Sequence, residues 1–313
     1  MSYSIDPISN RHRKKRAHYS GVFIVSMAFL AFIVIGFTVS LSIRACSHQK
    51  SYAQEKIQYA EPNLEPVVTK YEEVTEENIP YEMPDSVVRI CMLRPLEGVS
   101  EQIICKTAYI VSYNKDTKIP NWVAWHLTAE HTDGPISRMN FYEEESVASP
   151  RATLEDYRGS GWSRGHMCPA GDNKWNETAM YESFSLVNVC PQNANLNSGL
   201  WNSIEIDCRR WARQYGDVYI VCGPVFLNRE HETIGTNDVF VPEAFFKVVL
   251  CLNGPPKALG IICRNTDGNR KRDLYYNSID QVERITGYDF FPALPDEVEN
   301  VVEAIADINE WIR

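Results

Sequence analysis

The sequence predicts an α+β fold with a mixed, mainly antiparallel sheet. Short segments rich in β-branched and aromatic residues are separated by turn residues, which is typical of strands. Other segments repeat apolar residues every three or four positions, which is typical of helices. These helical segments do not alternate regularly with the strands, as they would in a parallel sheet. The order of the segments along the chain therefore favours antiparallel pairing.

Five segments are predicted to form strands. The first two lie on either side of a polar turn at 114–120, which indicates a hairpin. Asn253-Gly254-Pro255 provides a turn between the last two. In chain order the predicted strands are Thr107–Tyr113, Trp122–Thr128, Val218–Val221, Phe245–Leu252 and Ala258–Cys263.

Three helices are predicted among and after these strands. The first covers Asn197–Tyr215, has an apolar stripe at near-helical spacing, and should end at Gly216. A capping box formed by Ser278 and Gln281 starts the second helix. The third is an amphipathic helix over Asp296–Ile312.

The N-terminal part of the chain has a different composition. Residues 22–43 are uncharged and apolar over a length that can span a bilayer as a helix. Basic residues gather in 1–21, and the positive-inside rule places such a tail in the cytoplasm. We therefore predict a transmembrane signal anchor at 22–43 that holds the C-terminal domain outside the cytoplasm, in the periplasm or at the cell surface. A cleaved signal peptide, which would release a secreted protein, is the alternative.

Two regions follow the predicted anchor. Residues 44–86 are acidic and contain several prolines, which is typical of an extended linker. Residues 87–313 are long enough to bury a substantial core and are predicted to form one folded domain. Outside the cytoplasm the cysteines of this domain can form disulfides, in pairings that their spacing does not decide.

The overall charge restricts the classes of function. The formal net charge of the whole chain is −10 at pH 7. A globally acidic protein does not match a passive coat for nucleic acid, whose surface is basic. If the domain handles nucleic acid, a local basic cleft has to do so.

Polar residue types that suit phosphodiester hydrolysis lie close together in the sequence. At 100° per residue, Glu205 lies about 80° and Arg209 about 120° around the helix from Asn197, so the three share one broad polar face. His166 precedes them in a glycine-containing segment beside Arg164. An imidazole, an amide, a carboxylate and guanidiniums can together cut a phosphodiester with one hard cation. The alternative is an ordinary solvated helix face with an N-capping asparagine, and a structural or surface histidine.

Taken together, these motifs resemble those of the DNA/RNA non-specific endonuclease family. This family comprises the Serratia-type, sugar-non-specific nucleases of the ββα-metal superfamily. The resemblance runs from about Cys105 to Pro295. It rests on Ser163-Arg164-Gly165-His166-Met167, on Asn188-Val189-Cys190-Pro191-Gln192, on Asn197, Glu205 and Arg209, and on Val221-Cys222-Gly223-Pro224-Val225-Phe226.

The resemblance implies a ββα-metal (His-Me finger) catalytic motif and a role for each matching residue. His166 would be the general base, and Asn197 would be the single protein ligand of a Mg²⁺ ion, with Mn²⁺ as an alternative ion. Asn188 would help to place the catalytic groups, and Glu205 would hydrogen-bond water on the metal. The phosphate contacts would come from Arg164, Arg209 and Arg138.

The physical chemistry of these groups agrees with the implied roles. Mg²⁺ keeps several of its waters, so one neutral oxygen ligand together with a substrate phosphate suffices to hold it. A neutral imidazole can take a proton from an attacking water. Chemistry directed at the backbone needs no contact with base edges. We therefore predict that residues 87–313 are a Mg²⁺-dependent endonuclease that hydrolyses DNA and RNA with little sequence specificity.

One position departs from the family pattern. Ser163 stands where the family usually has an aspartate, and loss of that carboxylate predicts reduced or retuned activity. Two alternative functions follow from the same sequence. One is a cell-surface nuclease that assists DNA uptake. The other is a catalytically inactive, membrane-anchored domain that only binds nucleic acid.

Overall fold

The computed structural model describes residues 83–267 and 271–311. The predicted tail 1–21, the predicted anchor 22–43 and nearly all of the predicted linker 44–86 lie outside the described residues. Among the helices of the described part, none combines the length and the apolar character needed to cross a membrane.

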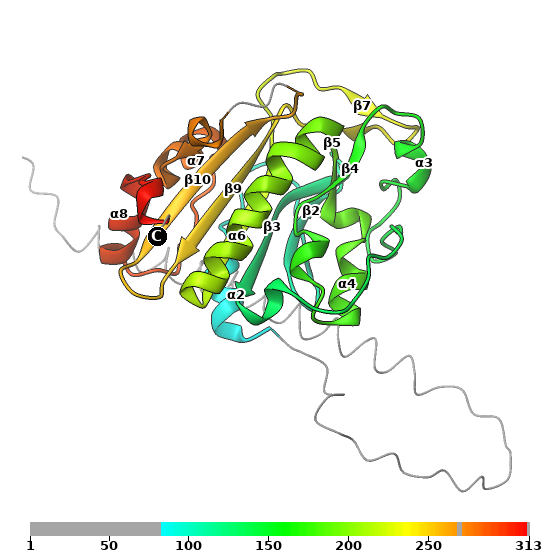
Figure 1. Cartoon of the computed structure of the whole chain (residues 1–313). Coiled ribbons are helices and arrows are strands. Elements are labelled where there is room, and N and C mark those ends of the chain that lie inside the picture. The colour runs from blue at the N-terminus through cyan, green and yellow to red at the C-terminus, as the bar shows by residue number, and fades with distance from the viewer. Residues whose placement is uncertain (1–82, 268–270, 312–313) are drawn as a thin grey trace, which may run out of the picture. The chain divides into compact units, whose positions relative to one another are not determined.

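A seven-stranded sheet forms the centre of the domain (Figure 1). Its strand order is β1-β2-β3-β6-β9-β10-β11, and every neighbouring pair is antiparallel. This confirms the predicted α+β class with a mainly antiparallel sheet. The strands are β1 (Gln102–Cys105), β2 (Ile110–Asn114), β3 (Ile119–Thr128), β6 (Asp217–Val225), β9 (Ala244–Cys251), β10 (Lys257–Arg264) and β11 (Tyr276–Asn277).

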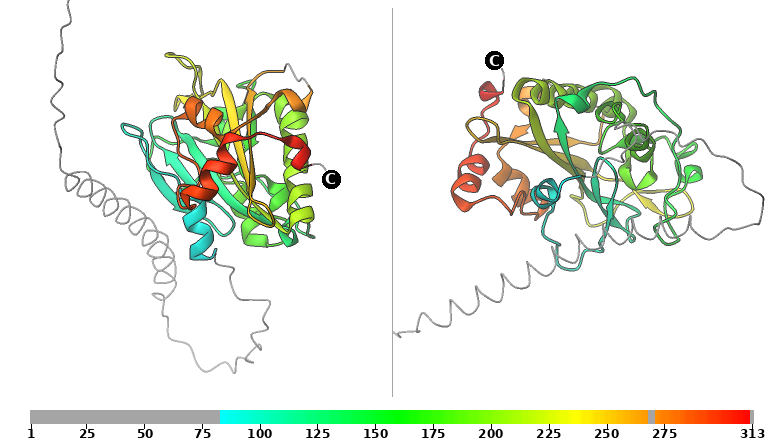
Figure 2. Two further views of the ribbon diagram at one scale, coloured as in Figure 1. Left: turned by 90° about the vertical axis from the view of Figure 1, so that its left-hand side faces the viewer. Right: turned by 90° about the horizontal axis from the view of Figure 1, so that it is seen from below.

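Helices cover both faces of this sheet, as the two views in Figure 2 show. On one face lie α2 (Asp85–Cys91), α7 (Ile279–Thr286) and α8 (Asp296–Ala304), whose apolar residues join those of β3, β6 and β9. On the other face lies α6 (Asn202–Tyr215), whose apolar stripe is buried against β3 and β6. Both faces are therefore dry, which explains why the central strands are almost continuously apolar.

Shorter elements complete the described part. Two small two-stranded sheets pair β4 (Ser163–His166) with β5 (Val189–Gln192) and β7 (Thr233–Ile234) with β8 (Val239–Phe240). The short helices are η2 (Glu130–Thr132), α3 (Leu154–Tyr157), η3 (Ala170–Asp172), α4 (Glu177–Ser183), η4 (Leu186–Asn188), α5 (Ala194–Leu196), η5 (Asn197–Trp201), η6 (Arg272–Leu274) and η7 (Ile308–Glu310).

The predicted C-terminal helix is shorter than expected. It was expected to run to residue 312, but α8 ends at Ala304 and Ile305 is extended. The reason lies in the packing, because Val302 belongs to the core on the α7 side whereas Ile308 and Trp311 pack into the core on the α6 side. The chain has to pass from one face of the sheet to the other, and a continuous helix cannot do so.

Most cysteines of the described part do not form the disulfides that an oxidising compartment would allow. Seven of the described cysteines are free and buried, and Cys105 is disulfide-bonded. Burial raises the pKa of each free thiol, for Cys91 and Cys208 to about 12. These thiols are therefore packing groups and poor nucleophiles.

Candidate functional site

The predicted general base lies on β4, one strand of the small β4–β5 sheet beside α6. His166 pairs with Val189, and Gly165 pairs with Cys190. A Cβ atom at Gly165 would lie 2.2 Å from Oε1 of Gln192, so only glycine allows the buried glutamine to pack against the strand. This close approach fixes the position of β4 just before His166.

The His166 imidazole is buried between two aromatic rings. It is 7% exposed, and its ring centroid lies 4.9 Å from those of Phe141 and Phe184. Nε2 has no hydrogen-bond partner among the described residues. Burial, assisted by the charge of Arg138, lowers the pKa of His166 to about 3. The imidazole is therefore neutral at physiological pH and has a nitrogen available to accept a proton.

Asn188 fastens the chain that follows His166. Its Oδ1 accepts from the backbone N–H of Cys168 at 2.8 Å, and its Nδ2 donates to the carbonyls of Cys168 and Ser183, each at 2.8 Å. Its own carbonyl accepts from the Met167 N–H at 2.9 Å. The buried amide is thus occupied by backbone groups, and Asn188 acts on the site through the position of its neighbours.

Asn197 and Glu205 come from the helical segment that follows β5. Asn197 opens the π-helical turn η5, and its side chain has no hydrogen-bond partner within the described part of the chain. A π turn rotates less per residue than an α-helix. It therefore brings Asn197 closer to the side of Glu205 than the roughly 80° separation of a regular α-helix would.

Glu205 is partly buried and lies among other charged side chains. Burial raises the pKa of Glu205 to about 7, and the positive charges of Lys247, Arg209 and Arg138 oppose that rise. Arg138 also contributes to the lowered pKa of His166. The charge of Arg138 therefore acts on both His166 and Glu205, which belong to a strand and a helix that are far apart in sequence.

The three predicted phosphate-binding arginines have different surroundings. Arg138 and Arg164 are exposed, and their guanidiniums lie over the rings of Phe184 and Phe141 at 5.2 and 4.7 Å. Because these are the rings that enclose His166, both guanidiniums flank the imidazole. Arg209 is 14% exposed and donates to Asp172 at 2.7 Å. Its charge is therefore largely balanced inside the protein.

Several residues of this site were not predicted from the sequence. Asp172 is buried, and it accepts from Arg209 and from Nε1 of Trp125 at 3.1 Å. Lys247 is buried beneath the helix that carries Glu205. Two features of the sequence could have indicated these residues. Asp172 follows shortly after His166, and Lys247 lies within an otherwise apolar strand. An ionisable residue in a buried strand is unusual enough to mark a site.

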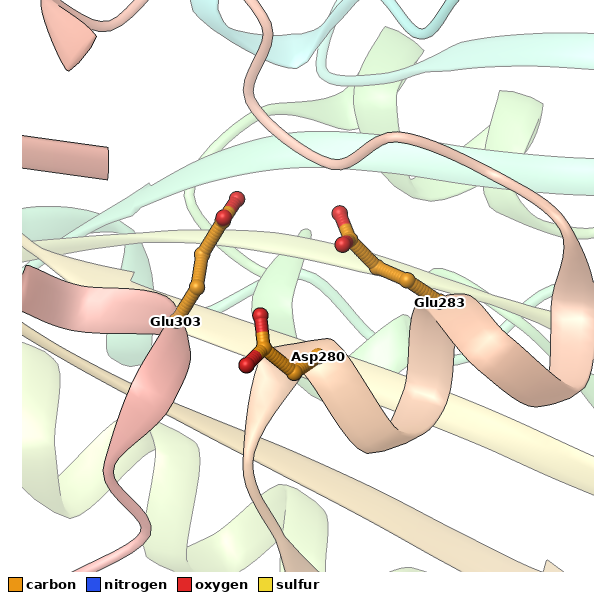
Figure 3. A group of neighbouring side chains, drawn as sticks. All are labelled: Asp280, Glu283 and Glu303. Carbon is orange, nitrogen blue, oxygen red and sulfur yellow. The ribbon is translucent and has the colours of Figure 1, made fainter. Parts of the chain in front are cut away.

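A second group of charged side chains lies on the opposite side of the sheet. Figure 3 shows the carboxylates of Asp280, Glu283 and Glu303, which come from α7 and α8 and approach one another. Asp289 and Glu299 form a neighbouring group with the same Glu303. These carboxylates belong to the side of the sheet away from α6. Their main consequence is mutual repulsion between α7 and α8.

Replacing Glu303 with glutamine is expected to stabilise the domain at alkaline pH. Burial and the neighbouring carboxylates, Glu283 first, raise the pKa of Glu303 from 4.5 to about 8. The folded state therefore loses stability as pH rises from 4.5 through 8, and the substitution removes that loss. Because the side chain is partly exposed, the gain should be about 1 kcal/mol. This corresponds to a rise of about 2–4 °C in Tm.

Thermal melts of both proteins between pH 4 and pH 9 measure this effect. The gain should be complete above pH 8 and disappear as the pH falls below 4.5, where the carboxyl is protonated in both states. Glu297→Gln, an exposed position on the same helix, is the matched control. A Glu303→Gln gain that does not change with pH would contradict the repulsion argument.

Comparisons with known proteins place this geometry in a family. Residues 94–297 match the family described as DNA/RNA non-specific endonuclease. The chain is similar to mitochondrial nuclease EXOG of Mus musculus, with 36% identity over 69% of this chain and 63% of the relative. It is also similar to mitochondrial endonuclease G of Bos taurus, with 35% identity over 63% of this chain and 71% of the relative. The chain thus spans somewhat less than two thirds of the mouse relative.

A solved structure shares the fold. The crystal structure of EndoG in complex with EndoGI has a TM-score of 0.60 and 28% sequence identity. The match covers 65% of this chain and 90% of that chain. The arrangement of the central sheet and its helices is therefore that of a known nuclease fold.

The predicted localisation is wrong on these findings. A membrane-anchored domain outside the cytoplasm was expected, but the relatives include mitochondrial nucleases. The segment 22–43, on which that prediction relied, lies outside the described residues.

Proposed function

The chain belongs to the DNA/RNA non-specific endonuclease family, and on that premise we propose that it is a metal-dependent endonuclease that hydrolyses DNA and RNA with little sequence specificity. One observation supports this proposal above the others. His166 is a buried, neutral imidazole with an unpartnered Nε2, and two exposed guanidiniums flank it. A proton acceptor beside paired phosphate-binding groups suits the attack of water on a phosphodiester.

In the proposed mechanism the β4–β5 pair and the following helix form the ββα-metal motif. The imidazole of His166 accepts a proton from the attacking water, because it is neutral at physiological pH. Phe141 and Phe184 keep bulk water away from the ring and hold its plane. Asn188 keeps the residues after His166 in place through its bonds to the backbone.

Arg138 and Arg164 bind the phosphate of the substrate in this proposal. Guanidiniums donate in a fork that matches two phosphate oxygens. Both side chains are exposed and lie over rings that touch His166, so a phosphate held between them is next to the base. Contacts of this kind read the backbone, and low sequence specificity follows.

The side chains on the helix fit a hard divalent cation. The Asn197 amide has no partner within the described residues, and Glu205 provides a carboxylate on the same helix. Oxygen donors of this type are those that Mg²⁺ prefers. We propose Asn197 as the direct protein ligand, with Glu205 holding metal-bound water. When bound, Mg²⁺ or Mn²⁺ would stabilise negative charge developing on the phosphate and the leaving oxygen.

Incubation of the purified full chain with plasmid DNA and with structured RNA tests this function. Cleavage of both substrates is expected in Mg²⁺, with complete loss in EDTA and recovery when Mg²⁺ or Mn²⁺ is added back. Cleavage that persists in EDTA would contradict metal dependence. Binding without cleavage in either ion would instead favour the inactive nucleic-acid-binding alternative that Ser163 motivates.

A further inference from the structure

Lys247 is a completely buried cation that the proposed mechanism leaves unexplained. It lies on β9 with 0% exposure, and its Nζ meets only the thiol of Cys222, a weak acceptor that leaves the other donors of the ammonium without partners among the described residues. A buried charge without hydrogen bonds destabilises a fold, and an apolar side chain of similar size is often better tolerated. An unsatisfied buried group of this kind therefore calls for a reason other than stability.

Two indole rings enclose the Lys247 ammonium. Nζ lies 4.8 Å from the ring centroid of Trp125 and 4.6 Å from that of Trp201. Both distances are within the range of cation–π attraction, which is stronger where water is excluded. Trp125 belongs to β3 and Trp201 to η5, so the ammonium packs between the central sheet and the π-helical turn.

Each of the two indole rings is connected to a residue of the candidate site, through the chain or through a hydrogen bond. Trp201 is the last residue of the π-helical turn that Asn197 opens. Trp125 donates through Nε1 to Asp172, and Asp172 accepts from Arg209. Lys247 therefore contacts the supports of both Asn197 and Arg209, although it reaches neither of them directly.

The charges around Lys247 are complementary. Burial lowers the pKa of Lys247, whereas the carboxylates of Glu205 and Asp172 raise it and favour the charged ammonium. The thiols of Cys222 and Cys208 are uncharged at neutral pH, because burial raises their own pKa values. Lys247 and Arg209 are thus two cations that interact with two carboxylates, those of the buried Asp172 and the partly buried Glu205. Removal of Lys247 leaves this group with an excess of negative charge.

We propose that Lys247 is a positioning residue, whose buried ammonium holds the π-helical turn of Asn197 and the Asp172–Arg209 pair in the geometry that the site requires. Its effect on catalysis rests on the proposed nuclease function. Its effect on the order of the turn rests only on the contacts of the ammonium with Trp125 and Trp201. The two effects are measured separately.

Substitutions that separate charge from packing test the proposal in the full chain. Lys247→Met and Lys247→Gln remove the charge and keep most of the volume, whereas Lys247→Arg keeps the charge on a planar group that can stack on indoles. Lys257→Met is the matched control. Lys257 also contacts two aromatic rings, Tyr215 at 3.6 Å and Trp311 at 5.3 Å, but it lies on β10 away from the site.

Hydrogen exchange of the backbone amides in 197–201 is the first measurement. Both neutral variants should exchange at least about tenfold faster there than the wild type, because the turn loses its anchor. The arginine variant should recover most of the protection, and Lys257→Met should match the wild type. Melting temperatures of all variants measure separately how much stability is lost when the carboxylates of Glu205 and Asp172 lose one of their two cations. Unchanged exchange in both neutral variants would overturn the proposal.

Steady-state cleavage is the second measurement. The neutral variants should lose at least about tenfold in kcat with KM within about twofold, because the exposed arginines still bind substrate. The Lys247→Arg variant should recover part of the lost kcat. A wild-type kcat in both neutral variants would overturn the catalytic part of the proposal while the nuclease function stands. If the wild type itself does not cleave, the proposed function fails, and the exchange measurement still decides the role of Lys247. If the methionine variant does not fold, the glutamine and arginine variants make the same comparison.

Discussion

His166→Ala is expected to lower kcat for plasmid cleavage by about 10²- to 10⁴-fold, the usual contribution of a positioned general base. The fold should survive, because Nε2 makes no hydrogen bond that the substitution would remove. KM should change little, because the exposed Arg138 and Arg164 remain. Initial rates over a range of substrate concentrations, together with a thermal melt, measure the three effects.

His231→Ala is the matched control for this substitution. His231 is also enclosed by two phenylalanine rings, those of Phe226 at 4.7 Å and Phe240 at 5.6 Å, but it lies near the β7–β8 pair. Its removal should leave kcat within about twofold of the wild type. If His166→Ala cleaves as fast as His231→Ala, another group accepts the proton and the assignment of His166 is wrong.

Asp172→Ala is expected to cause the largest loss of stability among single substitutions near the site. It leaves the guanidinium of Arg209 and the indole N–H of Trp125 without their shared acceptor in the protein interior. Breaking one partner of a buried ion pair typically costs about 3–5 kcal/mol. Urea unfolding, followed by the fluorescence of the buried tryptophans, gives the change in the free energy of unfolding.

An exposed ion pair provides the control for Asp172. Glu155 and Arg158 lie at 3.2 Å with side chains 71% and 76% exposed. Glu155→Ala should therefore cost less than about 1 kcal/mol. Equal losses at the two positions would show that the Asp172–Arg209 pair is not an internal support of the site.

The parts of the fold that depend on local sequence were predicted well. The hairpin formed by β2 and β3 and the capping box at Ser278 and Gln281 both depend on residues a few positions apart. The apolar stripe of α6 likewise identifies its buried face. In each case the signal and the structure lie in the same short segment.

Features that depend on distant packing were not predicted. The break after Ala304 arises because the two ends of the expected helix pack on different faces of the sheet. The burial of Asp172 and Lys247 depends on partners far away in the sequence, Arg209 and Trp125 for the first and Trp125 and Trp201 for the second. The π-helical turn at Asn197 is also set by its surroundings, because periodicity alone predicts a regular helix.

The hydrogen bonds of Asn188 have a consequence for the segment that connects β4 to β5. Its side chain bonds to both the N–H and the carbonyl of Cys168, as a strand neighbour would, and thereby continues the β4–β5 ladder by one rung. The long segment that connects β4 to β5 therefore begins and ends at residues that these hydrogen bonds hold together. The segment also carries Asp172 and Phe184 to the site, so its ends and its contacts with His166 and Arg209 are fixed together. Asn188 in this way ties the whole segment to the strand that carries His166.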